Sequence, residues 1–302
     1  MIIALIALGY SLVYGIIELI NFAHGDLVML GGFFSLTLIG LLGLNNPDIS
    51  NTTFVLSFIF VFVATTLFCG FLNYLIDRYA YAPIRNSSRL PQLVTAIGVS
   101  FVLMNIGLLW GGLPMDVFNF GNAAAAQKDF PSIISNQNLI SSENVQFSLK
   151  DLTVYLITIP LMFALSYFVK NTKMGTAMRA VAQNPTAAEL MGIDVNKIIS
   201  LTFIIGGMLG GVASIVFSIY NNTIYFQMGY RIGMDGFTAA VLGGIGNLPG
   251  AVLGGILIGL LRAFCDQYIA TKWTNSFVFL ILIVVLVFRP NGLLGAKVRD
   301  KV

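Results

Sequence analysis

The sequence predicts an all-α integral membrane protein with about eight transmembrane helices. Of its 302 residues, 57% are hydrophobic and only 10% are charged, and the mean hydropathy is +0.87. Soluble domains carry roughly a quarter charged residues. The apolar runs are continuous rather than alternating, which favours helices over a transmembrane β-barrel. The same composition excludes a soluble enzyme, a nucleic-acid binder and a disordered protein.

Six apolar runs are close to the length of about 20 residues that a membrane-crossing helix needs, and a seventh, at 276–288, is shorter. We expect spans at residues 2–20, 27–44, 54–76, 93–110, 152–169, 198–219 and 276–288. A Gly-rich apolar stretch at 237–261 lies between the last two of them. All of these segments are expected to belong to one transmembrane domain over residues 1–302.

Positive charge predicts which loops face the cytoplasm. Eleven of the sixteen Lys and Arg residues fall in the segments 77–92 and 170–197 and in the tail that starts at Arg289. We therefore place these three segments inside the cell. The remaining loops are poorer in basic residues and are predicted outside: 45–53, 111–151, 220–236 and 262–275.

The Gly-rich stretch is predicted to enter the membrane and return. A single crossing there would put the basic tail outside, against its charge. Gly246, Pro249 and Gly250 supply a helix break, because Pro and Gly interrupt helices and broken backbone at membrane depth needs protein or water beside it. We expect a re-entrant pair of half-helices at about 237–245 and 250–261, with one kinked crossing helix as the alternative.

A second polar interruption separates the first two spans. It holds Asn21, His24 and Asp26, with Glu18 one helical turn before it. Ionisable groups inside a membrane tend to face a cavity or a partner, but polar groups also cap helix ends. We expect Asp26 to be a helix N-cap, and His24 to make a structural hydrogen bond rather than bind a metal.

One interruption in each half of the chain is typical of transporters that have internal repeats and a path at the repeat interface. We therefore expect an internal repeat. The polar groups at the two interruptions are the candidates for lining the translocation path: Asn21, His24, Asp26 and Asn247. Proton relays usually need chains of ionisable groups, which this sequence lacks at mid-span, so an ion-coupled mechanism is disfavoured.

Motifs for catalysis or metal binding are missing from the sequence. With a single His, the chain lacks a His-Glu-x-x-His zinc site, and it also lacks a Gly-x-x-x-x-Gly-Lys-Ser/Thr phosphate loop. We expect no catalytic residue, metal or cofactor on this chain.

Glycines four residues apart predict close helix packing in lipid, either within the chain or between subunits. These pairs are Gly206 and Gly210, Gly207 and Gly211, Gly250 and Gly254, and Gly255 and Gly259.

The predicted cytoplasmic segment 170–197 is amphipathic and Ala-rich, too polar to span a membrane and too patterned for a random loop. Pro185 is expected to start a helix with Asn184 as its cap, and Gly192 to end it. A compact helical knob of this kind fits a cleft in another protein. A surface helix lying on the membrane is the alternative.

Residues 174–184 (MGTAMRAVAQN) and 187–193 (AAELMGI) resemble the coupling loop of permeases of branched-chain amino-acid ABC transporters. Further blocks resemble the same family in the same order. They are 4–15 (ALIALGYSLVYG), 20–26 (INFAHGD), 83–85 (PIR), 95–98 (TAIG), 237–246 (FTAAVLGGIG), 249–250 (PG) and 289–295 (RPNGLLG). The resemblance thus covers nearly the whole chain.

The resemblance implies a multi-pass protein of the bacterial inner membrane that moves substrate by alternating access. Its implied partners are a sister permease or a second copy, two ATP-binding subunits that hold ATP and Mg²⁺, and a periplasmic substrate-binding protein. Branched-chain or other neutral hydrophobic amino acids are the implied substrates. Urea or short amides, or an ion-coupled secondary transporter, are the alternatives. The residues implied to receive motion from the ATPase are Gly175, Arg179, Ala180, Asn184, Ala187, Ala188 and Gly192.

Overall fold

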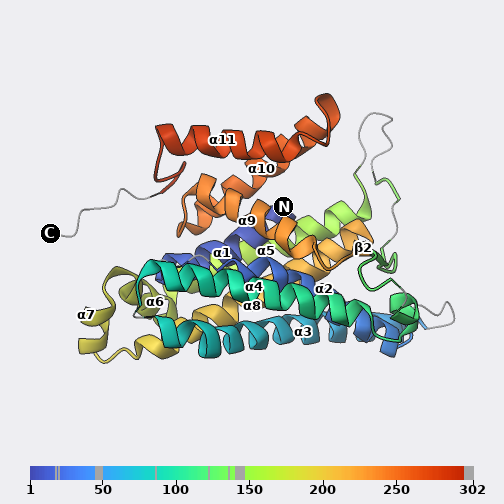
Figure 1. Ribbon diagram of the computed structural model, residues 1–302, viewed down its shortest axis with the longest axis horizontal. Coiled ribbons are helices and arrows are strands. Elements are labelled where there is room, and N and C mark those ends of the chain that lie inside the picture. The colour runs from blue at the N-terminus through green and yellow to red at the C-terminus, as the bar shows by residue number, and fades with distance from the viewer. Residues whose placement is uncertain are drawn as a thin grey trace. The chain divides into compact units, whose positions relative to one another are not determined.

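The computed structural model describes residues 1–17, 19, 21–44, 50–85, 87–121, 123–134, 137–139 and 147–295, and they are largely helical (Figure 1). The α-helices are α1 (Ile2–Ile17), α2 (Ala23–Leu41), α3 (Asn51–Ile76), α4 (Arg89–Gly111), α5 (Leu149–Asn171), α6 (Lys173–Gln183), α7 (Pro185–Leu190), α8 (Val195–Asn221), α9 (Met228–Gly243), α10 (Leu248–Tyr268) and α11 (Thr274–Phe288). The shorter elements are the π-helix η1 (Asp77–Tyr81), the 3-10 helices η2 (Ala82–Ile84) and η3 (Asp116–Gly121), and the strands β1 (Lys128–Asp129) and β2 (Thr223–Ile224).

The predicted all-α membrane architecture is confirmed. Among the described residues, α2, α3 with its η1 and η2 extension, α4, α5, α8 and α10 are long and apolar enough to cross a membrane, and α1 and α11 are shorter apolar helices. Each predicted span falls on one of these helices. Helices form there because a helix satisfies its backbone hydrogen bonds internally, which lipid demands.

The Gly-rich stretch forms two helices, α9 and α10, with the predicted break between them. Their far ends lie beyond the predicted half-helices, because α9 begins at Met228 and α10 continues to Tyr268. With 21 residues, α10 is about 30 Å long and can itself cross a bilayer. The predicted limits were too short because charged residues near these ends are typical of loops, whereas the structure pairs them between helices.

Contacts within the chain divide it into two compact units that alternate along the sequence. Unit 1 contains residues 1–21, 158–206 and 232–302, and unit 2 contains residues 22–157 and 207–231. The chain passes from one unit to the other inside α5, α8 and α9, so each of these helices contributes to both cores.

Unit 1 is organised around α1, whose residues from Ala4 to Leu8 are fully buried. α1 lies along α10, and Gly255 permits this approach because a Cβ there would overlap the Ala4 backbone. Gly254 faces the carbonyl oxygen of Ala239 in α9, so α10 packs closely against a second helix as well. In Figure 1, α10 lies between α9 and α11.

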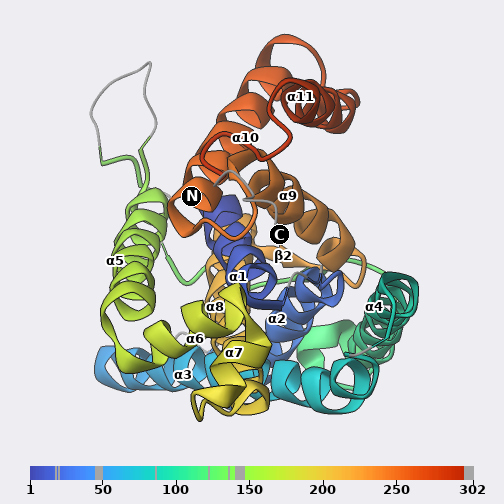
Figure 2. The same cartoon turned by 90° about the vertical axis from the view of Figure 1, so that its left-hand side faces the viewer.

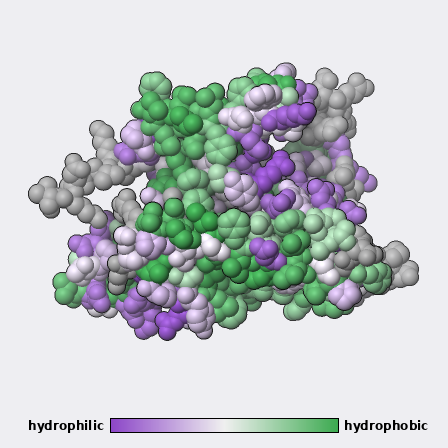
Figure 3. All heavy atoms as spheres, viewed as in Figure 1, coloured by the Kyte–Doolittle hydropathy of each residue, from purple (hydrophilic) through white to green (hydrophobic). Residues whose placement is uncertain are grey.

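Unit 2 has the largely buried α2 at its centre, in contact with α3 and α4. α3 and α4 expose many large apolar side chains, among them Phe60, Phe71 and Leu109. These helices contribute to the large apolar areas of the face shown in Figure 3. Exposed apolar faces of this kind are what a surface in contact with lipid requires.

Several predicted glycine pairs pack within the chain. A Cβ on Gly207 or Gly211 of α8 would meet the α3 backbone, at 2.5 Å and 2.8 Å respectively. Gly250 of α10 faces the Gly243 carbonyl of α9 in the same way. Gly259 differs, because nothing in the described structure lies within 4 Å of the Cβ position there.

The described part of the predicted outer loop 111–151 folds around a buried lysine. β1 and β2 pair antiparallel, with Lys128 opposite Ile224. The fully buried Lys128 ammonium donates to the carbonyl oxygens of Phe118 and Ala123, each at 3.2 Å. Burial lowers the pKa of Lys128, because loss of water disfavours the charged ammonium.

Candidate functional site

The predicted coupling segment forms two capped helices that follow α5, as Figure 2 shows. Thr172 caps α6 by accepting a hydrogen bond from the Gly175 N–H at 3.0 Å. Asn184 caps α7 by accepting from the Ala187 N–H at 3.0 Å. Gly192 follows α7 in the left-handed conformation, with φ +82°. The predicted helix start at Pro185, its cap and its end are therefore confirmed.

α6 is fastened to the end of α5 by two of the predicted coupling residues. The Arg179 guanidinium donates from Nη1 to the carbonyl oxygens of Val169 and Lys170, the latter at 2.9 Å. Gly175 is buried, and a Cβ there would overlap the carbonyl oxygens of Phe168 and Val169. The turn between α5 and α6 is therefore a rigid corner rather than a flexible loop.

The far end of the coupling segment presents apolar side chains to the outside. Leu190 and Met191 are 85% and 83% exposed. Ala187 is exposed as well, whereas Ala188 is buried and Ala180 is half-buried. Sequence reasoning did not single out Leu190 and Met191, although two exposed apolar residues at the end of a polar helix were a usable signal.

The predicted helix break lies between Gly243 and Leu248. Gly244 and Gly246 adopt positive φ values of +107° and +84°, which residues with a Cβ rarely adopt. Pro249 and Gly250 fall in the first turn of α10 instead of in the break, where Pro is well tolerated.

Asn247 and the C-terminal segment together hold the break. The Asn247 side chain accepts from the Gly250 N–H at 3.3 Å and donates to the Leu294 carbonyl oxygen at 2.6 Å. The N–H groups of Leu293 and Leu294 donate to the carbonyl oxygens of Leu242 and Gly243, at 2.9 Å and 3.0 Å. The last carbonyls of α9 are thus bonded by a segment about fifty residues further along the chain.

α6 and the break meet the same stretch of α1. A Cβ on Gly15 of α1 would lie 3.0 Å from the Gly246 Cα. A cavity of about 80 Å³ is lined by residues of α1, α6 and the break, including Ser11, Arg179 and Leu248. Within unit 1, α6 is therefore connected to the break through α1.

The second predicted interruption is shorter than expected, because α2 already begins at Ala23. His24 and Asp26 lie in its first turns and are buried. Asp26 is not the N-cap, since that position is Phe22 and makes no side-chain cap bond. The prediction was wrong because the helix begins three residues before Asp26.

Asp26 instead joins α2 to α4, where its Oδ2 accepts a hydrogen bond from the Ser100 hydroxyl. Gly229 of α9 packs against the same side chain, because a Cβ there would lie 2.5 Å from Asp26 Oδ1. Asn21 is buried in unit 1. Glu18 lies outside the described residues. The path-lining role of these polar groups stays a prediction.

A polar cluster that sequence reasoning missed connects α9, α10 and α11. Arg262 forms an ion pair with Asp235 and donates to Asn275 at 2.6 Å. The Thr274 hydroxyl donates to Asp266 close by in the sequence. From the sequence, Asp235 and Arg262 were predicted to lie in outer loops. The sequence therefore gave no reason to expect an ion pair between two helices.

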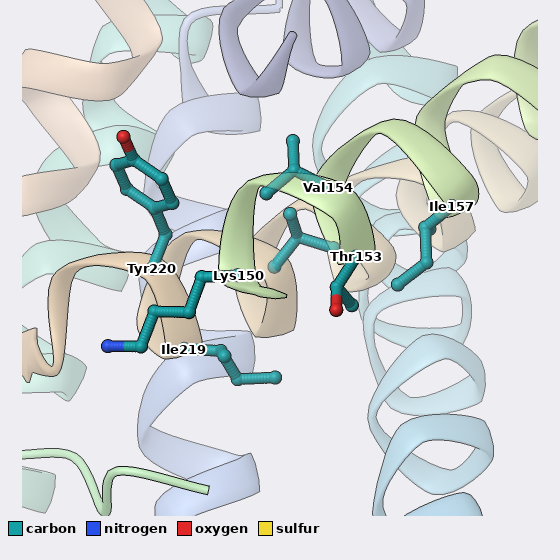
Figure 4. A pocket seen from close by; sticks show the side chains of 7 residues that line it. Lys150, Thr153, Val154, Ile157, Ile219 and Tyr220 are labelled. Atoms are coloured by element: carbon teal, nitrogen blue, oxygen red, sulfur yellow. The ribbon is translucent and has the colours of Figure 1, made fainter. Parts of the chain in front are cut away.

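Two pockets in the described part of unit 2 do not resemble a site for a polar substrate. Figure 4 shows one between α5 and α8, lined by Lys150, Thr153, Tyr220 and apolar side chains. It holds about 10 Å³, roughly one water molecule. A second, of about 530 Å³, is an open groove between α3 and α4 with an almost entirely apolar lining. Sites for small polar ligands are enclosed and carry convergent polar groups.

The sequence matches a known family over nearly its whole length. The matching family is described as branched-chain amino acid transport system / permease component, and it covers residues 1–287. The chain belongs to this family. The apolar helices, the capped α6–α7 segment and the α9–α10 break are therefore parts of a membrane permease.

Two named relatives match the permease almost end to end, and a third matches about two thirds of it. It is 36% identical to the high-affinity branched-chain amino acid transport system permease protein LivH of Salmonella typhimurium, over 99% of this chain and 93% of that protein. It is also 36% identical, with the same coverage, to the protein BraD of Pseudomonas aeruginosa, which carries the same description. The autoinducer 2 import system permease protein LsrC of Klebsiella pneumoniae is 27% identical over 66% of this chain and 55% of that protein. No solved structure matches the chain significantly.

Proposed function

We propose that the permease is the transmembrane subunit of an ATP-driven importer for branched-chain or other neutral hydrophobic amino acids. It works in the bacterial inner membrane with a sister permease or a second copy, two ATP-binding subunits and a periplasmic substrate-binding protein. ATP and Mg²⁺ are bound by the ATP-binding subunits, and this chain needs no cofactor of its own. The names of its 36% identical relatives, which are branched-chain amino acid permeases, support the substrate class.

The observation that carries the proposal is the exposed tip of the α6–α7 segment. Leu190 and Met191 are almost fully exposed on a short helix that is capped at its start and followed by a rigid turn. An apolar tip on a compact polar knob is suited to a cleft in another protein. Since basic residues mark this segment as cytoplasmic, the fitting partner is an ATP-binding subunit.

Motion of the knob reaches the rest of unit 1 through rigid contacts. Arg179 and Gly175 tie α6 to α5, so the two helices move as one body. α6 also contacts α1, and Gly15 of α1 touches the break at Gly246. Closure of the ATP-binding subunits thus shifts the break between inward-facing and outward-facing states, since packed elements switch between discrete arrangements.

Selectivity in this scheme rests largely on the external binding protein. The permease then needs only a path of modest affinity that opens alternately to either side.

Site-directed cross-linking tests the docking of the coupling segment. Met191→Cys in the assembled importer is expected to form a cross-link to an ATP-binding subunit. Tyr230→Cys, which is also well exposed at 67% but lies in a segment predicted outside, serves as the control. The native Cys69 and Cys265 are buried and add little background. Labelling of Met191→Cys from outside intact cells by a membrane-impermeant thiol reagent would refute the proposal.

A further inference from the structure

A largely buried ion pair inside unit 1 leaves part of the Arg262 guanidinium without a hydrogen bond. Asp235 on α9 and Arg262 on α10 form the pair, with side chains 15% and 13% exposed. The Arg262 Nη2 donates to Asp235 and also to Asn275 at the start of α11. Arg262 lies in α10, a helix long and apolar enough to cross a membrane, where ionisable groups are costly and are candidates for functional sites.

Arg262 retains hydrogen-bonding capacity that its present partners do not use. Both of its side-chain bonds come from the same nitrogen, Nη2. Its Nε is buried and has no partner within the described part of the chain. A guanidinium offers five N–H groups in a fixed plane, which match the two oxygens of a carboxylate. The arrangement leaves donors available to a further carboxylate.

We propose that Asp235 and Arg262 are a transient binding site for the two charges of a zwitterionic α-amino acid. Arg262 binds the substrate carboxylate, Asp235 binds the ammonium group, and Asn275 accepts from the guanidinium and keeps it in place. This inference rests on the proposed transport function. It assigns to the permease itself the recognition of the carboxylate and ammonium groups of the substrate.

Charge balance favours a zwitterion over other small substrates. A lone buried charge is expensive, so an ion pair in a membrane protein opens readily only if both halves find new partners. A zwitterion supplies one negative and one positive group, and the exchange leaves every charge paired. Urea and short amides are uncharged and leave the pair closed, which separates them from amino acids as substrates.

A purely structural role is less suited to these contacts. The approach of α10 to α9 is already set by Gly254 against the Ala239 carbonyl, and α11 is joined to α10 by the Thr274–Asp266 bond. An ion pair that only fastened helices would also bond through more of the guanidinium, because unmet buried donors cost stability. The unbonded Nε is expected at a site that exchanges partners.

Uptake of L-leucine by the complete importer in proteoliposomes tests the site. Arg262→Lys keeps the ion pair but loses the planar fork, so assembly is expected to be normal and uptake to fall by roughly tenfold or more. The exchange Asp235→Arg with Arg262→Asp keeps both charges but reverses their positions, and uptake is expected to fall by at least about a hundredfold. Asp266→Asn, which alters the neighbouring bond between α10 and α11, is the control and retains uptake.

Two results would overturn the proposed substrate site. Normal uptake in the charge-exchanged variant would overturn it, because a fastening pair works in either order. Failure of Arg262→Lys to assemble with its partners would also overturn it, since the guanidinium would then be needed for folding. If the unaltered importer takes up no amino acid at all, the proposed function fails instead, and the two failures are distinguished by that one measurement.

Discussion

Arg179 uses its charge within its own chain. Its guanidinium is exposed, yet it donates to the Val169 and Lys170 carbonyl oxygens at the C-terminal end of α5. Cations stabilise that end of a helix because its last carbonyls lack helical partners. The family resemblance implied that Arg179 receives motion from a partner. The structure adds that Arg179 is a positioning residue, which sets the direction of α6 relative to α5.

Replacing Arg179 therefore should uncouple transport from ATP hydrolysis. Arg179→Glu puts a carboxylate against two carbonyl oxygens, and we expect ATP-driven uptake to fall by at least about tenfold while membrane insertion stays normal. Arg179→Lys, which can reach one carbonyl, should retain part of the uptake.

The control is Lys173→Gln, which removes a cation from an exposed position of the same helix. Uptake and the ratio of substrate moved to ATP hydrolysed are measured for all three variants. Normal coupling in Arg179→Glu would show that the corner between α5 and α6 plays no part in transmission.

At the scale of residues, local rules predicted the caps but not the long-range bonds. Asn184, Pro185 and Gly192 were placed correctly because helix starts and stops depend on a few neighbouring residues. The partner of Arg179 was not predictable in this way, since it depends on the angle between two helices. Asp26 was wrongly predicted to be the N-cap because the predicted start of this helix was a few residues too late, and the start decides which residue is the cap.

The α9–α10 pair is held together by its own close packing and by a segment from the C-terminal end of the chain. α9 and α10 approach so closely that Gly243 and Gly250 touch through their backbones, and the segment after α11 bonds the free carbonyls at the end of α9. The break therefore moves with the surrounding helices as a connected part of unit 1 rather than as a free loop.

Because α9 packs closely on α10, we expect substitutions of two glycines in α10 to have different effects on stability. Gly254→Leu would place its side chain on the Ala239 carbonyl, and we expect it to destabilise the purified permease by about 1–3 kcal/mol or to prevent its accumulation. Gly259→Leu is the matched control, because the space around its Cβ is open in the described structure.

Thermal unfolding of both variants in detergent measures the difference. The expected result is a lower midpoint for Gly254→Leu and an unchanged one for Gly259→Leu. Equal midpoints for the two variants would contradict the observed approach of α9 to α10.

Helices were predictable from hydropathy, and their ends were less so. Continuous apolar runs placed α1 to α5, α8 and α11, because lipid leaves a chain few alternatives to the helix. The limits of α9 and α10 were missed because composition assigns Asp235 and Arg262 to loops. The ion pair between them depends on how the two helices pack, which a local sequence pattern does not predict.

Across the whole molecule, the parts that we propose receive and use motion belong to the same unit. The α6–α7 segment, the α9–α10 break and the Asp235–Arg262 pair all lie in unit 1. Unit 2 holds α3 and α4 with their exposed apolar faces, and the described part of the outer loop. Sequence reasoning did not predict this division, because the units alternate along the chain and share α5, α8 and α9.

The central claim is that this permease moves amino acids only when a separate motor drives it. The most direct measurement is uptake of leucine, valine, urea and acetamide into proteoliposomes that hold the complete importer, with and without ATP and the ATP-binding subunits. We predict uptake of leucine and valine that requires both, and no uptake of urea or acetamide. Uptake by the permease alone, driven by an ion gradient, would contradict the account.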